Sequence, residues 1–169
     1  MFAAALDIFS KLGFEYLSRW AHVLVGITWI GLLYYFNFVQ VPAFGEMEAA
    51  ARNNAVDKLA SRALWWFRWA AAATVVTGLL ILGFQENLTK MGYFKTGSGI
   101  AIATGILFGL TMFVNVWAII WRKQKTVIAN ARNVQAGGEP DPAAAGAGRV
   151  ALLASRQNTI YSLPMLVFM

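Results

Sequence analysis

The first hydrophobic stretch of the chain, residues 21–41, limits the possible folds more than any other part of the sequence. An α-helix rises about 1.5 Å per residue, so about 20 apolar residues cross the roughly 30 Å hydrocarbon core of a bilayer. Residues 21–41 supply this length without a Lys, Arg, Asp or Glu side chain. The sequence therefore predicts that its first long helix spans a membrane.

The same stretch carries polar side chains along one side of the predicted helix. At about 100° per residue, one narrow arc holds His22, Gly26, Trp29, Leu33, Asn37 and Gln40. Polar groups are costly within a membrane and usually face the interior of a helix bundle. We therefore expect this side to pack against protein, a cofactor or water.

Composition and further apolar stretches extend this prediction to several spans. Only 13% of the 169 residues are charged, against about 25% in soluble domains. Residues 63–84 and 99–121 are each long enough to cross a bilayer. Residues 157–169 are too short, which predicts an incomplete fourth span and a natural chain that continues beyond Met169. Residues 136–148, rich in Gly, Pro and Ala, predict a flexible linker.

The expected fold is all-α. Residues 1–169 form one integral membrane domain, a polytopic bundle of about four transmembrane helices, the fourth incomplete, with amphipathic connector helices. If the two long connectors share one side, they and the span ends beside them hold ten of the 14 Lys and Arg residues. The positive-inside rule then predicts that the N-terminus is outside and that the long connectors are cytoplasmic.

His22 is the only histidine, and three roles are open for it. It could be a hydrogen-bonded interfacial side chain, an axial ligand of haem b, or a proton-relay or quinone-contacting group. A haem would need a second ligand from a methionine or from another chain. The chain has no cysteine, so it holds no disulfide and no c-type haem attachment site. We favour the hydrogen-bonded role with no cofactor, and keep haem b as the alternative.

The other amide and hydroxyl groups of the spans favour a structural role. They form a polar stripe on two expected helices, made of Asn37, Gln40, Thr104, Thr111 and Asn115. Such groups commonly join membrane helices, each contributing about 1 kcal/mol or less. We expect interhelical hydrogen bonds here in preference to a binding site.

Arg68 stands among tryptophans near the start of the second predicted span. Its neighbours Trp65, Trp66 and Trp69 are typical of an interfacial aromatic belt. The arginine is expected to extend to the headgroups with the indoles along its stem. A contact with an acidic lipid, a haem propionate or a partner carboxylate is the alternative.

Several signals of catalysis and transport are missing from the sequence. No Asp or Glu lies inside the three long predicted spans, and the chain has no P-loop and no dinucleotide-binding glycine pattern. Pumps and metal-containing oxidases usually need carboxylates or several histidines at membrane depth. The sequence also contains no nucleic-acid-binding module. We therefore do not expect an enzyme in this chain by itself, and we expect no metal site.

Three stretches, residues 19–42, 61–78 and 155–169, carry a family resemblance. In this order they are similar to the urate oxidase N-terminal membrane-domain family. This family is the membrane module of bacterial cytochrome-c-linked urate oxidases and also occurs as short stand-alone proteins. The resemblance implies a bacterial inner-membrane protein linked to electron transport, with His22 at the position of a first-span histidine.

Three hypotheses for function follow. The leading one is a non-catalytic integral membrane subunit, an accessory subunit of a larger bacterial redox or energy-converting complex. Its expected partners are the lipid bilayer and other membrane protein subunits, and no nucleic acid. The first alternative is a haem- or quinone-linked electron-transfer membrane anchor related to urate oxidase. The second is a small transporter or channel lined by His22 and the polar stripe.

Overall fold

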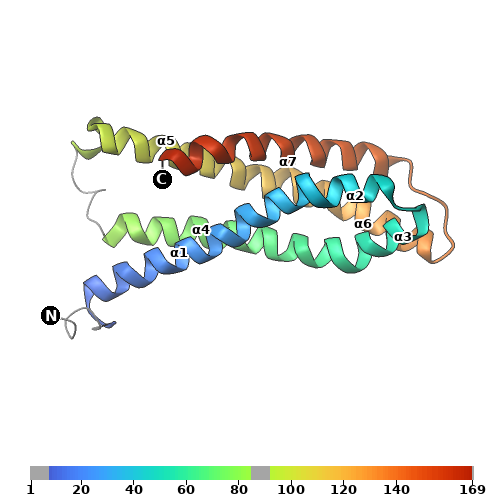
Figure 1. Cartoon of the computed structure of the whole chain (residues 1–169), viewed down its shortest axis with the longest axis horizontal. Helices are drawn as coiled ribbons and strands as arrows, with labels where there is room; N and C mark the ends of the chain where they lie inside the picture. Colours follow the sequence, from blue (N-terminus) through green and yellow to red (C-terminus); the bar gives the residue numbers. More distant parts are fainter. Residues whose placement is uncertain (1–7, 85–91, 169) are drawn as a thin grey trace.

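The computed structural model describes residues 8–84 and 92–168, and these residues form four long helical rods joined by short connections (Figure 1). The described residues contain no β-strand. Three rods are long and apolar enough to cross a membrane, namely Lys11–Glu46, Ala49–Phe84 and Gly97–Gln135. The all-α prediction is therefore confirmed for the described residues. Three of their helices are apolar enough for a membrane protein, as predicted.

The first rod is one continuous helix with a wider turn in its second half. It consists of α1 (Lys11–Tyr34), the π-helical η2 (Tyr35–Gln40) and α2 (Val41–Glu46). Ser10 caps its start, because its hydroxyl oxygen accepts a hydrogen bond from the Gly13 amide at 3.0 Å. This rod contains the whole predicted span 21–41.

The second and third rods repeat the same plan. The second consists of α3 (Ala49–Ala55), the π-helical η3 (Val56–Ala60) and α4 (Ser61–Phe84). The third follows a short 3₁₀ turn, η5 (Tyr93–Lys95). It consists of α5 (Gly97–Val114), the π-helical η6 (Asn115–Ile120) and α6 (Trp121–Gln135).

One glycine is required where the third rod begins. A Cβ atom on Gly99 would collide with the carbonyl group of Tyr93 and with the backbone of Phe94. The Thr96 side chain caps the helix there by accepting a hydrogen bond from the Gly99 amide at 3.1 Å. Glycine therefore allows the 3₁₀ turn to pack directly against the first turn of α5.

The fourth rod, α7 (Ala143–Phe168), is longer than the sequence predicted. Residues 143–148, expected in the flexible linker, form its first turns, so the connection from α6 is only residues 136–142. The helix includes most of the predicted short segment 157–169, of which Met169 lies outside the described residues. Arg156, Gln157 and Asn158 interrupt its apolar sequence, and α7 is not among the helices apolar enough to span by composition.

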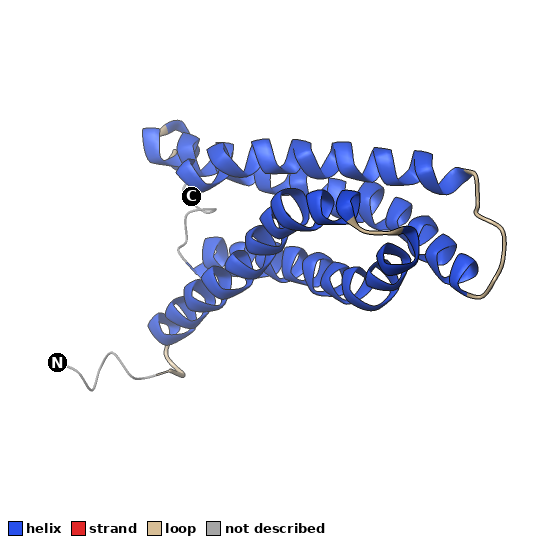
Figure 2. Ribbon diagram, turned by 45° about the vertical axis from the view of Figure 1, so that its right-hand side comes forward, coloured by secondary structure: helices blue, strands red, loops and turns tan. Residues whose placement is uncertain are grey.

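The rods run alternately up and down, so that α1 begins and α7 ends at the same end of the bundle (Figure 1). α1 packs along α4, and α7 packs along α5 and α6. Figure 2 shows the same arrangement from another side, with the α2–α3 turn and the α6–α7 connection together at the opposite end. The largest fully buried apolar side chains lie between the rods: Trp29, Leu33, Phe67, Met112 and Val116.

Candidate functional site

His22 lies in the seam between α1 and α4. Its Nδ1 atom is 3.0 Å from the Thr77 hydroxyl oxygen, within hydrogen-bond distance. A Cβ atom on Gly78 would lie only 3.2 Å from the imidazole Cε1, so the missing side chain leaves room for the ring. The imidazole is half-buried and is held on one side by α4.

This environment bears on the haem hypothesis for His22. The described residues contain no group of three His, Cys, Asp or Glu side chains that could hold a metal ion. His22 offers one ring nitrogen to an axial position, since Nδ1 already faces Thr77. A haem b on this histidine therefore needs its second strong ligand from a methionine or from another chain.

Asn37 connects the first rod to α7. Its side-chain amide nitrogen donates to the Leu33 carbonyl and to the Ser155 hydroxyl, both at 2.8 Å. One helical turn away, the Tyr34 hydroxyl and the Ser162 hydroxyl lie 2.9 Å apart. These contacts place two polar bonds between α7 and the first rod.

Asn115 and Asn158 form the most enclosed polar contact of the bundle. The Asn115 side chain donates to Asn158 Oδ1 at 2.9 Å, and Asn158 donates to the Met112 carbonyl at 3.0 Å. Asn158 is 0% exposed. The π-helical turn beginning at Asn115 changes the backbone bonding from i+4 to i+5, and the Asn158 amide supplies a donor to a carbonyl at this irregularity.

Two other residues of the stripe form hydrogen bonds only within their own helix. Thr104 and Thr111 donate to the carbonyls of Ile100 and Leu107 in their own helix, both at 2.8 Å. Neither threonine forms a hydrogen bond with another helix among the described residues, in contrast to Asn37 and Asn115. Each hydroxyl donates its hydrogen bond to a backbone carbonyl of the same helix, which is common for Ser and Thr in helices.

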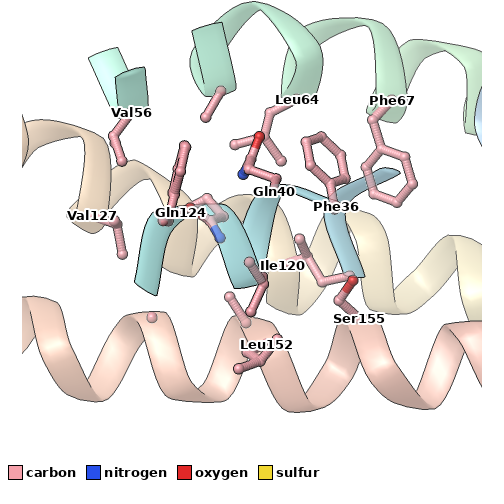
Figure 3. Close-up of a pocket in the computed structure, with 15 residues that line it drawn as sticks. Phe36, Gln40, Val56, Leu64, Phe67, Ile120, Gln124, Val127, Leu152 and Ser155 are labelled. Carbon is pink, nitrogen blue, oxygen red and sulfur yellow. The ribbon is translucent and has the colours of Figure 1, made fainter. Parts of the chain in front are cut away.

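A cavity of about 180 Å³ lies between the four rods (Figure 3). Its polar lining comes from Gln40, Gln124 and Ser155, and no charged side chain is among the described residues around it. The Gln40 Oε1 atom is buried and has no hydrogen-bond partner among the described residues. The apolar lining is Phe36, Val41, Phe44, Val56, Ala60, Leu64, Phe67, Ile120, Val127, Gly148, Ala151 and Leu152.

The three π-helical segments all contribute to this cavity. Phe36 and Gln40 come from η2, Val56 and Ala60 from η3, and Ile120 from η6. A π turn widens a helix locally and often occurs at functional sites. The cavity can accept a small neutral molecule or several waters, and an unpaired amide oxygen offers it one hydrogen-bond acceptor.

Arg68 packs against indole rings at the start of the apolar part of α4. Its guanidinium carbon lies 3.8 Å from the centre of the Trp121 ring, and 5.9 Å and 5.8 Å from the rings of Trp69 and Trp117. The side chain is half-buried and its Nε has no hydrogen-bond partner among the described residues. Cation–π contact therefore accounts for its position.

The tryptophans beside Arg68 point outward. The exposed fractions are 47% for Trp65, 60% for Trp66 and 48% for Trp69. Trp65 contacts both of the others edge-on or tilted, with ring centres 5.2 Å and 6.4 Å apart. This exposed aromatic surface is available to lipid or to a partner.

An ion-pair cluster closes the connector end of the bundle. Asp57, which precedes the apolar residues of α4, lies 2.7 Å from Lys58 Nζ and 2.5 Å from Arg132 Nε. The hydrogen bonds from Lys58 and then from Arg132 lower the pKa of the Asp57 carboxyl below its usual range. The carboxylate is therefore charged at neutral pH and joins η3 to α6.

Sequence reasoning missed the α7 half of the polar interior. Ser155, Asn158 and Ser162 face inward in line with Ala147, Ala151 and other small buried residues. Their spacing of three and four residues is the signal that could have revealed this face. It was hidden because α7 was predicted as a short segment after a linker. Gln124 was also missed, because it lies among basic residues directly after the end of the predicted span 99–121.

Comparison of the sequence with protein families, with curated proteins and with solved structures gave no match.

Proposed function

We propose that the chain is a non-catalytic integral membrane subunit of a larger bacterial redox or energy-converting complex. One observation carries this proposal. Arg156 has an exposed side chain, although it lies in sequence between the buried residues Ser155 and Asn158. No ion pair joins it to a described residue. If α7 crosses the membrane, Arg156 lies between its two ends, where lipid tails would solvate an arginine poorly and a partner protein is the better neighbour.

In this proposal α7 is a fourth membrane crossing. The N-terminus lies outside, and the α2–α3 turn and the α6–α7 connection face the cytoplasm with most of the basic residues. The outward side of α7, with exposed Leu153, Arg156, Gln157 and Ile160, then contacts the neighbouring subunit. α7 is less apolar than the other rods, which agrees with a helix covered by protein on both sides.

The family resemblance of residues 19–42, 61–78 and 155–169 supports the same proposal. It associates the chain with the membrane module of urate oxidases and with an electron-transport setting. The chain has no CxxCH motif for a c-type haem. In this proposal the haem of such an electron-transfer system lies outside residues 1–169, and a partner subunit is its expected carrier.

Affinity purification from native membranes in a mild detergent tests the proposal. We expect larger redox subunits in fixed stoichiometry with the chain, identified by mass spectrometry. Arg156→Gln should reduce their recovery severalfold. Arg149 is an exposed arginine near the start of the same helix, and Arg149→Gln should not reduce it. Recovery of the chain alone, as a monomer or homo-oligomer, would reject the proposal.

The cavity favours one second candidate, a quinone- or haem-linked electron-transfer anchor. Gln40 and Gln124 place amide groups among aromatic and aliphatic walls (Figure 3), a lining suited to a neutral ring with carbonyl groups. A redox titration of the purified chain followed by visible and ultraviolet difference spectra tests this candidate. A signal lost in Gln40→Leu would support a quinone in the cavity, and one lost in His22→Leu would support a haem.

A further inference from the structure

A second hollow lies on the outer surface between α4 and α6. This α4–α6 recess has a volume of about 440 Å³ and opens outward, apart from the cavity inside the bundle. Ser61, Arg62 and Trp65 form one wall, and Trp121, Lys125 and Arg132 form the other. Two rods far apart in the sequence therefore bring three basic side chains around one hollow.

The positive charge of the recess is only partly compensated. Arg132 shares the Asp57 carboxylate with Lys58. Arg62 and Lys125 are exposed, and no ion pair or side-chain hydrogen bond joins either to a described residue. No carboxylate is among the described residues that line the recess. An anion placed there would meet two free cations and the remaining guanidinium N–H groups of Arg132.

The tryptophans locate the recess at the level of lipid headgroups. Trp65 and Trp121 form its side toward the apolar part of the bundle, and Trp121 carries Arg68 on its ring at 3.8 Å. Indole rings concentrate at the membrane–water interface, where one edge is apolar and the other is wet. Basic hollows between helices at this level are suited to anionic headgroups.

We propose that the α4–α6 recess binds the phosphate of an anionic phospholipid headgroup. Arg62 and Lys125 hold the phosphodiester, Arg132 adds a donor from the connector end, and the acyl chains leave past Trp65. The charge favours an anionic lipid over a zwitterionic one, because a choline group would place a fourth cation in the recess. This site is independent of the subunit role proposed above.

Lipid titration of the purified full-length chain by native mass spectrometry tests the site. Phosphatidylglycerol and cardiolipin are compared with phosphatidylcholine, and inorganic phosphate is the arm that separates a lipid from a free anion. The test variant is Arg62→Gln/Lys125→Gln. The matched control is Arg122→Gln/Lys123→Gln, which removes the same charge from exposed residues of α6 that do not line the recess.

The expected result is a loss of affinity confined to the recess. Each basic residue near an anionic headgroup contributes about 1 kcal/mol, so the double variant should bind phosphatidylglycerol about 30-fold more weakly. In the control variant, the factor by which binding weakens should be less than about a fifth of that of the test variant. Phosphatidylcholine should bind equally to all three proteins, and circular dichroism should show the same helix content in each.

Three outcomes would overturn the proposal. Equal losses in the test and control variants would mean general surface charge and no defined site. Inorganic phosphate that competes with the lipid at equal concentration would indicate a free-anion site. A double variant that kept its lipids but lost a co-purifying subunit would assign the recess to an acidic protein segment.

Discussion

α4 and α7 are both long helices of one bundle, but they use their polar side chains in opposite ways. In α4, Thr74 and Thr77 donate to the carbonyls of Ala70 and Ala73 in their own helix, at 2.8 Å and 2.7 Å. In α7, Ser155, Asn158 and Ser162 contact the first and third rods. α4 therefore satisfies most of its polar groups alone, whereas α7 depends on its neighbours.

This difference teaches what holds each helix in place. A self-satisfied apolar helix is stable in lipid, and its packing depends on shape and dispersion. A helix with buried amides must dock against matching groups, since an unpaired buried amide is costly. Substitutions that change polar contacts should therefore affect α7 strongly and α4 weakly.

The largest effect is expected for Asn158→Leu. This change removes the partner of Asn115 and the donor to the Met112 carbonyl, and leaves both groups buried. Losing both bonds in this enclosed site should lower the free energy of unfolding by about 2 kcal/mol. Unfolding in detergent followed by circular dichroism measures this value. A double-mutant cycle with Asn115→Leu should give a coupling of about 1 kcal/mol, and zero coupling would contradict the contact.

Asn37→Leu is expected to have the next largest effect. It removes the bond to Ser155, so α7 loses one of its links to the first rod. The expected destabilisation is about 1 kcal/mol, because an interhelical bond in a membrane protein averages less than a buried network. Thermal unfolding in detergent tests it, with Ser155→Ala as the partner variant. A stability equal to that of the unmodified chain would show that water replaces the bond.

His22→Leu should have a smaller effect still. The imidazole is half-buried in the α1–α4 seam and its contact with Thr77 joins helices that already pack closely. We expect a loss below about 1 kcal/mol, with assembly intact and an unchanged absorbance spectrum. Visible spectroscopy and thermal unfolding of the purified variant check both points. Disappearance of a haem band would instead make His22 a ligand.

Thr111→Val should change almost nothing. The hydroxyl donates to the Leu107 carbonyl of its own helix, and valine keeps the shape of the side chain. The expected change is within about 0.5 kcal/mol of zero, as for substitutions without a tertiary partner. A larger loss, measured under the same unfolding conditions, would reveal a contact with another subunit on this face of α5.

The first rod was largely predictable from its sequence. Its length, its apolar composition and the arc that holds Trp29, Leu33 and Asn37 follow from helix geometry, and both Trp29 and Leu33 are fully enclosed. The partners of Asn37 were not predictable. An amide in a helix gives the direction of a polar face, but Ser155 lies 118 positions away, and only packing brings the two together.

The stripe on the third rod shows where periodicity is insufficient. Thr104, Thr111 and Asn115 share a face by sequence, yet only Asn115 bonds another helix. A threonine hydroxyl reaches its own backbone carbonyl one turn earlier, whereas the longer amide of asparagine extends past it. The same pattern therefore produces a local bond at two positions and an interhelical bond at the third.

The sequence by itself determined the helical class and the three apolar rods, because both depend on hydrophobic length and on local backbone geometry. Only the tertiary structure decided the extent of α7, the cavity beside Gln40 and the charged walls of the α4–α6 recess. α7 has too many polar residues for its hydropathy to indicate a span, and it is helical along its whole length against partners on two other rods. The recess likewise exists because packing brings Arg62 and Lys125 to the same hollow. No local sequence pattern indicates that these two residues lie close together.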